Sequence, residues 1–87
     1  MENSENQVKR VALLGIIVSD GNAVSAVNEL LHEYGSFIVG RMGLPMRERN
    51  INTISLVLDA PTDVINALTG KLGAVNGVSA KALFGKV

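Results

Sequence analysis

The sequence predicts an α+β domain in which strand, helix and strand follow one another twice along 87 residues. Alternating or continuous apolar runs indicate strands, and apolar residues at three- and four-residue steps indicate helices. The strand patterns cover residues 8–19, 36–46, 51–59 and 78–84, and the helix patterns cover 22–34 and 61–73. Right-handed crossovers then give a four-stranded antiparallel sheet with both helices on one face, which is the ferredoxin-like βαββαβ sandwich.

The first strand pattern is apolar on both of its sides and ends at Asp20-Gly21. A strand of this kind belongs at the centre of a sheet. One side carries Ala12, Leu14, Ile16 and Val18, and the other carries Val11, Leu13, Gly15 and Ile17. We assign the first set to the helix side, because Gly15 contributes least to a core; the inverse assignment, shifted by one residue, is the alternative.

The two helix patterns each place apolar residues on one face. These residues are Val24, Val27, Leu30, Leu31 and Tyr34 in the first helix, and Val64, Ile65, Leu68 and Leu72 in the second. Gly35 follows the first helix, and we expect it to end that helix in the left-handed conformation. Asn76-Gly77 marks a turn before the last strand.

The second strand is expected at an edge of the sheet. Gly40, Gly43 and Pro45 interrupt its apolar run, and a proline cannot donate a hydrogen bond to a strand ladder. We therefore expect a bulge or a bend there. Residues 47–50 form a polar hairpin connection to the third strand, which alternates clearly and should be central.

One face of the predicted sheet has no helix over it. That face would expose apolar residues of the two central strands, namely Val11, Leu13, Ile17, Ile51 and Val57. An apolar sheet face in water favours an interface. We expect a homo-oligomer, a dimer or a tetramer, built on this face; a monomer that offers the same face to a different protein is the alternative.

Composition argues against several classes of function. Aromatic residues make up only 3% of the chain, and eight basic residues balance eight acidic ones. Nucleic-acid binders rely on basic excess and often on aromatic stacking, so we do not expect direct nucleic-acid binding without a partner. The chain has no cysteine, which removes disulfides and thiolate metal sites. We expect a cytoplasmic location.

The polar N-terminal residues and the shortness of the apolar runs fit a cytoplasmic location. Residues 1–7 read as a short disordered polar tail, and residues 8–87 read as a single domain. The longest apolar stretch, residues 11–18, is far shorter than the roughly 20 residues that span a bilayer. We therefore expect no membrane contact.

A cluster of arginines around the glycine–proline segment is the candidate ligand site. Arg41, Gly43, Pro45, Arg47 and Arg49 combine guanidinium groups with backbone that a ligand can approach closely. Such a cluster could hold a carboxylate or a phosphate. The alternative is a solvated hairpin tip that protects an edge strand from pairing with other chains.

No catalytic or metal-binding set is apparent in the sequence. His32 is the only histidine, and no cysteine accompanies it as a ligand. The acidic residues near it, Glu29 and Glu33, read as ordinary positions on the surface of a helix. We expect no cofactor, no metal and no enzymatic activity.

Three segments of the chain are similar to a known family. The segments 28–32 (NELLH), 40–48 (GRMGLPMRE) and 68–73 (LTGKLG), followed by Gly77-Val78, resemble small bacterial proteins described as regulators of the iron-only hydrogenase system. The resemblance implies an ACT-like fold, oligomerisation and a regulatory role. This family is also similar in fold to the sensing domain of nickel-responsive repressors. Those repressors bind metal through several histidines and a cysteine, whereas this chain has one histidine and no cysteine.

The sequence therefore predicts a regulatory or sensing module that binds a small ligand or a partner protein. A ligand-free adaptor that uses the bare sheet face is the second hypothesis. Direct contact with nucleic acid through Arg41, Arg47, Arg49 and Lys71 is the third.

Overall fold

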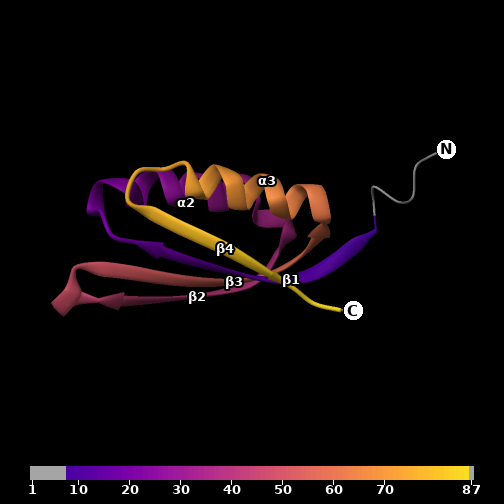
Figure 1. Ribbon diagram of the computed structural model, residues 1–87, viewed down its shortest axis with the longest axis horizontal. Coiled ribbons are helices and arrows are strands. Elements are labelled where there is room, and N and C mark those ends of the chain that lie inside the picture. The colour runs from indigo at the N-terminus through magenta and orange to yellow at the C-terminus, as the bar shows by residue number, and fades with distance from the viewer. Residues whose placement is uncertain (1–7, 87) are drawn as a thin grey trace.

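The computed structural model describes residues 8–86. The elements follow in the order β1 (Lys9–Val18), α2 (Val24–Glu33), β2 (Ile38–Met46), β3 (Ile51–Pro61), α3 (Thr62–Gly73) and β4 (Val78–Phe84). The strands form one antiparallel sheet in the order β2-β3-β1-β4, and both helices lie on one side of it (Figure 1). The predicted fold class is confirmed, and β1 and β3 are central. The predicted tail, residues 1–7, lies outside the described residues, and the single-domain assignment of residues 8–87 stays a prediction.

The core lies between the sheet and the two helices. The strands contribute Ala12, Leu14, Ile16, Val18, Leu56, Leu58 and Ala60, and the helices contribute Val27, Leu31, Ile65, Leu68 and Leu72. All of these side chains are at most 2% exposed. The assignment of the even-numbered side of β1 to the helices is therefore confirmed. The other side of β1 and β3 is open, because no element of the described chain covers it.

The edge strand β2 differs in one respect from the sequence prediction. Its ladder with β3 has a single irregularity, between Ile38 and Gly40, and is regular from there to the end of the strand. Gly43 and Pro45 pair with Ile54 and Asn52, so these two residues do not interrupt the strand. An edge strand tolerates a proline because it needs ladder hydrogen bonds on one side only.

The predicted left-handed cap at Gly35 is wrong. Among the described residues only Asn50 and Gly77 have positive φ. The first long helix instead leaves through a 3-10 turn, Gly35–Phe37, in which the Phe37 N–H donates to the Tyr34 carbonyl at 3.0 Å. This turn satisfies the end of the helix without a left-handed residue.

The helices leave β2 largely uncovered. Apart from Ile38, every residue of β2 is exposed, whereas the neighbouring strand β3 is buried at Leu56, Leu58 and Ala60. The β2–β3 hairpin closes through a 3-10 turn, Arg47–Arg49, and the left-handed Asn50. Figure 1 shows the hairpin reaching past the helices at the end of the molecule away from the N-terminus.

Candidate functional site

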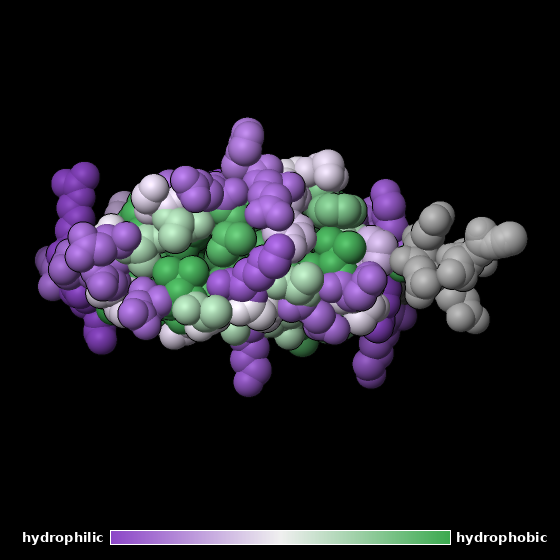
Figure 2. Space-filling view, turned by 90° about the horizontal axis from the view of Figure 1, so that it is seen from above, coloured by the Kyte–Doolittle hydropathy of each residue, from purple (hydrophilic) through white to green (hydrophobic). Residues whose placement is uncertain are grey.

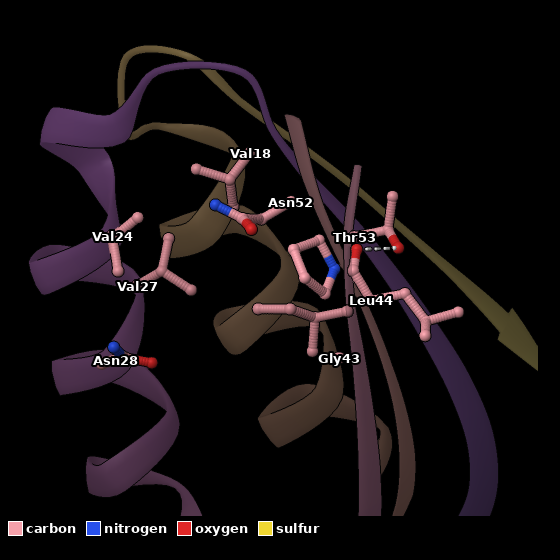
Figure 3. Close-up of a pocket in the computed structure, with 10 residues that line it drawn as sticks. Val18, Val24, Val27, Asn28, Gly43, Leu44, Asn52 and Thr53 are labelled. Atoms are coloured by element: carbon pink, nitrogen blue, oxygen red, sulfur yellow. Dashed lines mark hydrogen bonds between the residues drawn. The ribbon is translucent and has the colours of Figure 1, made fainter. Parts of the chain in front are cut away.

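A cleft opens between α2 and the β2–β3 hairpin, on the helix side of the sheet. Its volume is about 240 Å³. It is lined by Val18, Val24, Val27, Asn28, Gly43, Leu44, Pro45, Asn52, Thr53 and Ile54. Figure 3 shows Val24, Val27 and Asn28 of α2 facing the hairpin residues across this space. Figure 2, which looks onto the helix side, shows apolar surface between the polar side chains there.

The cleft exists because β2 carries small side chains on the side that faces α2, so the strand and the helix do not fill the space between them. Gly43 has no side chain, and a Cβ built on it would meet only the Thr53 carbonyl oxygen, at 3.9 Å. Pro45 follows on the same side of the strand, two residues further along. Val24, which is 37% exposed at the start of α2, forms the facing wall.

Two carboxamides are the polar side chains best placed to bind a ligand in this cleft. Asn28 comes from α2 and Asn52 from β3, and Figure 3 shows both beside the space that the cleft encloses. Within residues 8–86, neither carboxamide takes part in a side-chain hydrogen bond. The Thr53 hydroxyl is already engaged, because it donates to the Leu44 carbonyl at 3.0 Å. Each carboxamide keeps two N–H donors and one acceptor oxygen for a ligand.

A second, shallower hollow adjoins the cleft, and the two together form one groove. It is lined by Asn28, Leu31, His32, Gly35, Ile38 and Arg41, so Asn28 belongs to both spaces. Arg41 pairs with Leu56 and Gly43 pairs with Ile54, which places the two residues on one side of β2 about 7 Å apart along the strand. A guanidinium group therefore adjoins an apolar cleft whose own polar groups are neutral.

The structure distributes the predicted ligand-binding residues over two places. Arg41, Gly43 and Pro45 lie on the helix side of β2 and line the groove. Arg47 and Arg49 lie in the turn at the hairpin tip and line neither hollow. The sequence reasoning missed Asn28 and Asn52. Asn28 could have been found from the sequence, because it is a polar residue four positions after Val24, on the apolar side of the helix.

The described residues contain no conventional metal centre. Across residues 8–86, His, Cys, Asp and Glu side chains form no group of three that could hold a metal ion. His32 lies in the shallower hollow beside Arg41. No helix in this part of the chain is both long and apolar enough to cross a membrane.

The comparison with family models decides the relationship of the chain. Residues 10–82 match the TM1266-like family, described as "Iron-only hydrogenase system regulator, putative". The chain belongs to this family. The uncharacterized protein TM1266 from Thermotoga maritima is 44% identical, over 90% of this chain and 99% of that one, and its structure superimposes with a TM-score of 0.87. The family resemblance of the sequence motifs is thus confirmed, and the description of the family supports a regulatory role.

More distant structures share the fold. The ACT domain from the GTP pyrophosphokinase of Chlorobium tepidum is 22% identical over 86% of this chain and 99% of that one, with a TM-score of 0.73. The C-terminal domain of the MgtC protein from Mycobacterium tuberculosis is 16% identical over 99% of this chain and 95% of that one, with a TM-score of 0.68. No curated protein matches the chain. These likenesses establish an ACT-like architecture and nothing further about the ligand.

Proposed function

We propose that this family member is a ligand-sensing regulatory module: a small metabolite binds between α2 and the β2–β3 hairpin, and the module works as a homo-oligomer rather than as an enzyme. The observation that carries the proposal is the apolar cleft with two carboxamides, Asn28 and Asn52, that form no side-chain hydrogen bond with any residue the structure describes. Binding sites for small molecules combine apolar walls with a few polar groups in this way. The cytoplasmic location expected from the composition stays a prediction.

The size and chemistry of the groove define the class of ligand. The cleft of about 240 Å³ is smaller than the roughly 300–1,000 Å³ that drug-sized ligands occupy. Its apolar walls suit a short hydrocarbon body, and the carboxamides suit a polar substituent. Arg41, in the adjoining hollow, can hold a carboxylate or a phosphate through paired N–H donors. The ligand class is therefore a small organic anion with an apolar body.

The hairpin supplies a means of transmitting the signal. A ligand that binds Asn28 on α2 and also contacts Gly43 and Pro45 on β2 ties the uncovered edge strand to the body of the domain. Because β2 has few buried contacts of its own, ligand binding would add order to this edge strand. A regulatory partner could then distinguish the bound and free states by the position of the hairpin.

The test is a thermal-shift screen followed by calorimetry on matched variants. The probes are short and branched carboxylates, amino acids and nucleoside monophosphates. A ligand at 100 times its dissociation constant should stabilise the protein by about 2.7 kcal/mol. We expect Asn28→Ala and Asn52→Ala each to weaken binding by about tenfold, the loss of one or two hydrogen bonds. Asn66→Ala, at an exposed position of α3 outside both hollows, is the control and should bind as the parent does.

Two outcomes would contradict this proposal. No stabilisation by any class of probe would remove ligand sensing at this groove. A ligand that binds with equal affinity to the Asn28, Asn52 and Asn66 variants would show that the site lies elsewhere. Substitution of Arg41 by Lys separates the two halves of the groove: anion binding should weaken, while a neutral ligand of the cleft should be unaffected.

A ligand-free adaptor is the second candidate function, and the open sheet face favours it. Large apolar side chains such as Leu13 and Ile17 are 50% and 48% exposed on that face. If the screen finds no ligand and the protein is a monomer, capture of one stoichiometric protein that Leu13→Ala abolishes would favour the adaptor.

A further inference from the structure

The open sheet face carries a continuous apolar surface. In the described part of the chain, Val11, Leu13, Ile17, Met42, Leu44, Met46, Val57 and Leu83 lie on it with exposed fractions between 37% and 67%. The predicted interface residues Val11, Leu13, Ile17 and Val57 are among them, and Ile51, at the end of the face, is half-buried. Isolated apolar residues at a surface are ordinary, but a patch drawn from all four strands marks an interaction site.

A shallow trough lies in the middle of this face, over the two central strands. The ladders align Met42, Ser55, Gly15 and Lys81 in one row, in which the small residues Ser55 and Gly15 stand between the long side chains of the two edge strands. Gly15 forms its floor, and a Cβ built on Gly15 would meet no atom within 4 Å. The hollow beside it has a volume of about 460 Å³ and includes Gly15, Ile17 and Ser55 in its lining.

Nothing inside the domain explains the glycine at position 15. Its φ is not left-handed, and the space over it is open. A glycine in the interior of a strand weakens the strand, because it adds backbone entropy to the unfolded chain and offers no side chain to pack. Glycine in such a position is typical of a site that another backbone or side chain approaches closely.

A ridge lies next to the trough. The adjacent row consists of Gly40, Val57, Leu13 and Leu83, and the exposed fractions of the last three are 37%, 50% and 67%. Ridge and trough lie two residues apart on the same central strand, about 7 Å from each other. A two-fold axis that lies midway between two stacked sheets, passes over Leu14 and runs perpendicular to the strands therefore exchanges the two rows between two copies.

We infer that a second copy of this chain packs face to face on the open sheet, with Leu13 of each copy seated in the trough over Gly15 of the other. This inference rests on the self-association in the proposed function and assigns its surface. A two-fold interface uses one patch twice, so each residue's partner must meet the residue itself in return. The pair Leu13 and Gly15 fulfils that condition, because each copy supplies both the ridge and the trough.

The same axis pairs other residues well. It places Met42, 59% exposed, over Gly40 of the second copy, where an added Cβ would also meet nothing within 4 Å. It places Ile17 over Val11, so two half-exposed apolar side chains cover each other. It places the aliphatic stem of Lys81 over Leu83 of the second copy. The ammonium group of Lys81 can still reach water, because β4 is an edge strand. No lysine of the trough row is placed on another lysine.

The area of the face suits a dimer. Four strands about 4.8 Å apart and about eight residues long present about 500 Å² in projection, and corrugation by side chains increases the accessible area. Stable interfaces bury about 800 Å² on each partner. Two sheets stacked with nearly aligned strands, about 10 Å apart, are an established packing mode.

The test exchanges the ridge and the trough by substitution. Light scattering on the full chain should give twice the monomer mass of 9.2 kDa at high micromolar concentration. Gly15→Leu should fill the trough and weaken the dimer at least 100-fold, while the melting temperature of the dilute, monomeric protein stays the same or rises. Leu13→Gly should also weaken the dimer. The double variant Leu13→Gly with Gly15→Leu should dimerise again, since the axis still pairs a leucine with a glycine.

If the double variant dimerises again, the loss of the dimer in each single variant cannot be due to misfolding. Val39→Ala is the control, because Val39 is 69% exposed in the irregular part of β2, outside the paired rows. A parental dimer that Gly15→Leu leaves intact would overturn the assigned surface while self-association stands. A parental monomer would overturn self-association, and the ligand screen would then test the groove by itself.

Discussion

Gly77 lies directly against Asp20, where the turn before β4 meets the end of β1. A Cβ built on Gly77 would lie 2.5 Å from the Asp20 Cβ, and Gly77 has φ of +82°. Its carbonyl accepts hydrogen bonds from the Ser19 N–H at 2.7 Å and from the Ser19 hydroxyl at 3.1 Å. Asp20 in turn accepts from the Asn22 N–H at 2.9 Å, which caps the turn that leads into α2.

Gly77→Ala should destabilise the protein by at least about 1–2 kcal/mol, the cost of a left-handed alanine, with the contact to Asp20 adding to it. Urea denaturation gives the free energy of unfolding. Gly35→Ala is the matched control, because its added Cβ meets nothing within 4 Å and its φ is not left-handed. We expect that control to change stability by less than about 0.5 kcal/mol. Equal losses in both variants would contradict the role assigned to Gly77.

Leu56→Ala and Leu83→Ala make the same chemical change on opposite sides of the sheet. Leu56 is fully buried, and its truncation should cost about 2–5 kcal/mol at any protein concentration. Leu83 is 67% exposed in the ridge, so its truncation should leave the stability of the monomer nearly unchanged. The measurement is the melting temperature across a hundredfold range of concentration. Leu83→Ala should reduce only the part that depends on concentration, and a concentration-independent loss in this variant would argue against the interface.

Asn50 controls the hairpin that forms one wall of the cleft. It has φ of 56° and ψ of 42°, and its N–H donates to the Arg47 carbonyl at 3.1 Å. Asn50→Ala should cost about 1 kcal/mol, whereas Asn50→Gly should be close to neutral, because asparagine and glycine tolerate the left-handed region and alanine does not. Hydrogen exchange of the β2–β3 amides would show whether the loss is confined to the hairpin. An alanine variant as stable as the glycine variant would contradict this explanation.

Lys71 connects the ends of the two helices. Its ammonium lies 5.1 Å from the centre of the Tyr34 ring and 3.7 Å from a Glu33 carboxylate oxygen. Interaction with the Tyr34 side chain, followed by the charge of Glu33, raises the pKa of Lys71 above its ordinary value of 10.5. A raised pKa in the folded state means that this stabilisation is complete below pH 10.5 and is lost as the pH rises through the folded pKa.

Between pH 6 and pH 9, Lys71→Met should therefore show a constant difference in melting temperature from the parent protein. The difference should be small, since both charged groups are at least half exposed to solvent. NMR titration of the lysine side chains measures the pKa directly, and Tyr34→Phe should lower that of Lys71 more than Glu33→Gln does. An unshifted pKa in the parent protein would contradict the contact.

The alternation of the two central strands, together with Gly15, was enough to predict the core and the open face. In β1 the even-numbered residues were assigned to the core because Gly15, on the other side of the strand, contributes least to a core; the alternation alone also allowed the inverse assignment. The edge position of β2 followed from Pro45. These inferences depend on local periodicity, which the sheet preserves.

The sequence could not locate the cleft or the left-handed glycine, because both depend on contacts between distant segments. Asn28 and Asn52 line one cleft only after the hairpin folds beside α2. Gly35 directly follows the C-cap of α2, whereas Gly77 lies in the turn before β4, and the left-handed φ and the close approach to Asp20 distinguish Gly77. Arg47 and Arg49 are near Arg41 in sequence, but the extended strand carries them beyond the groove to the hairpin tip.

The length of the central strands also determines how the protein moves through a solution. The strands β1 and β3 hold 10 and 11 residues, so each extends about 33 Å or more at about 3.3 Å per residue, whereas four strands about 4.8 Å apart span only about 19 Å. A rod-like particle diffuses more slowly than a sphere of equal mass, so a monomer will elute early from a gel-filtration column and resemble a larger species. Sheet-to-sheet stacking thickens the rod without lengthening it. The frictional ratio should therefore fall when two copies associate, and sedimentation velocity will distinguish this stacking from end-to-end association.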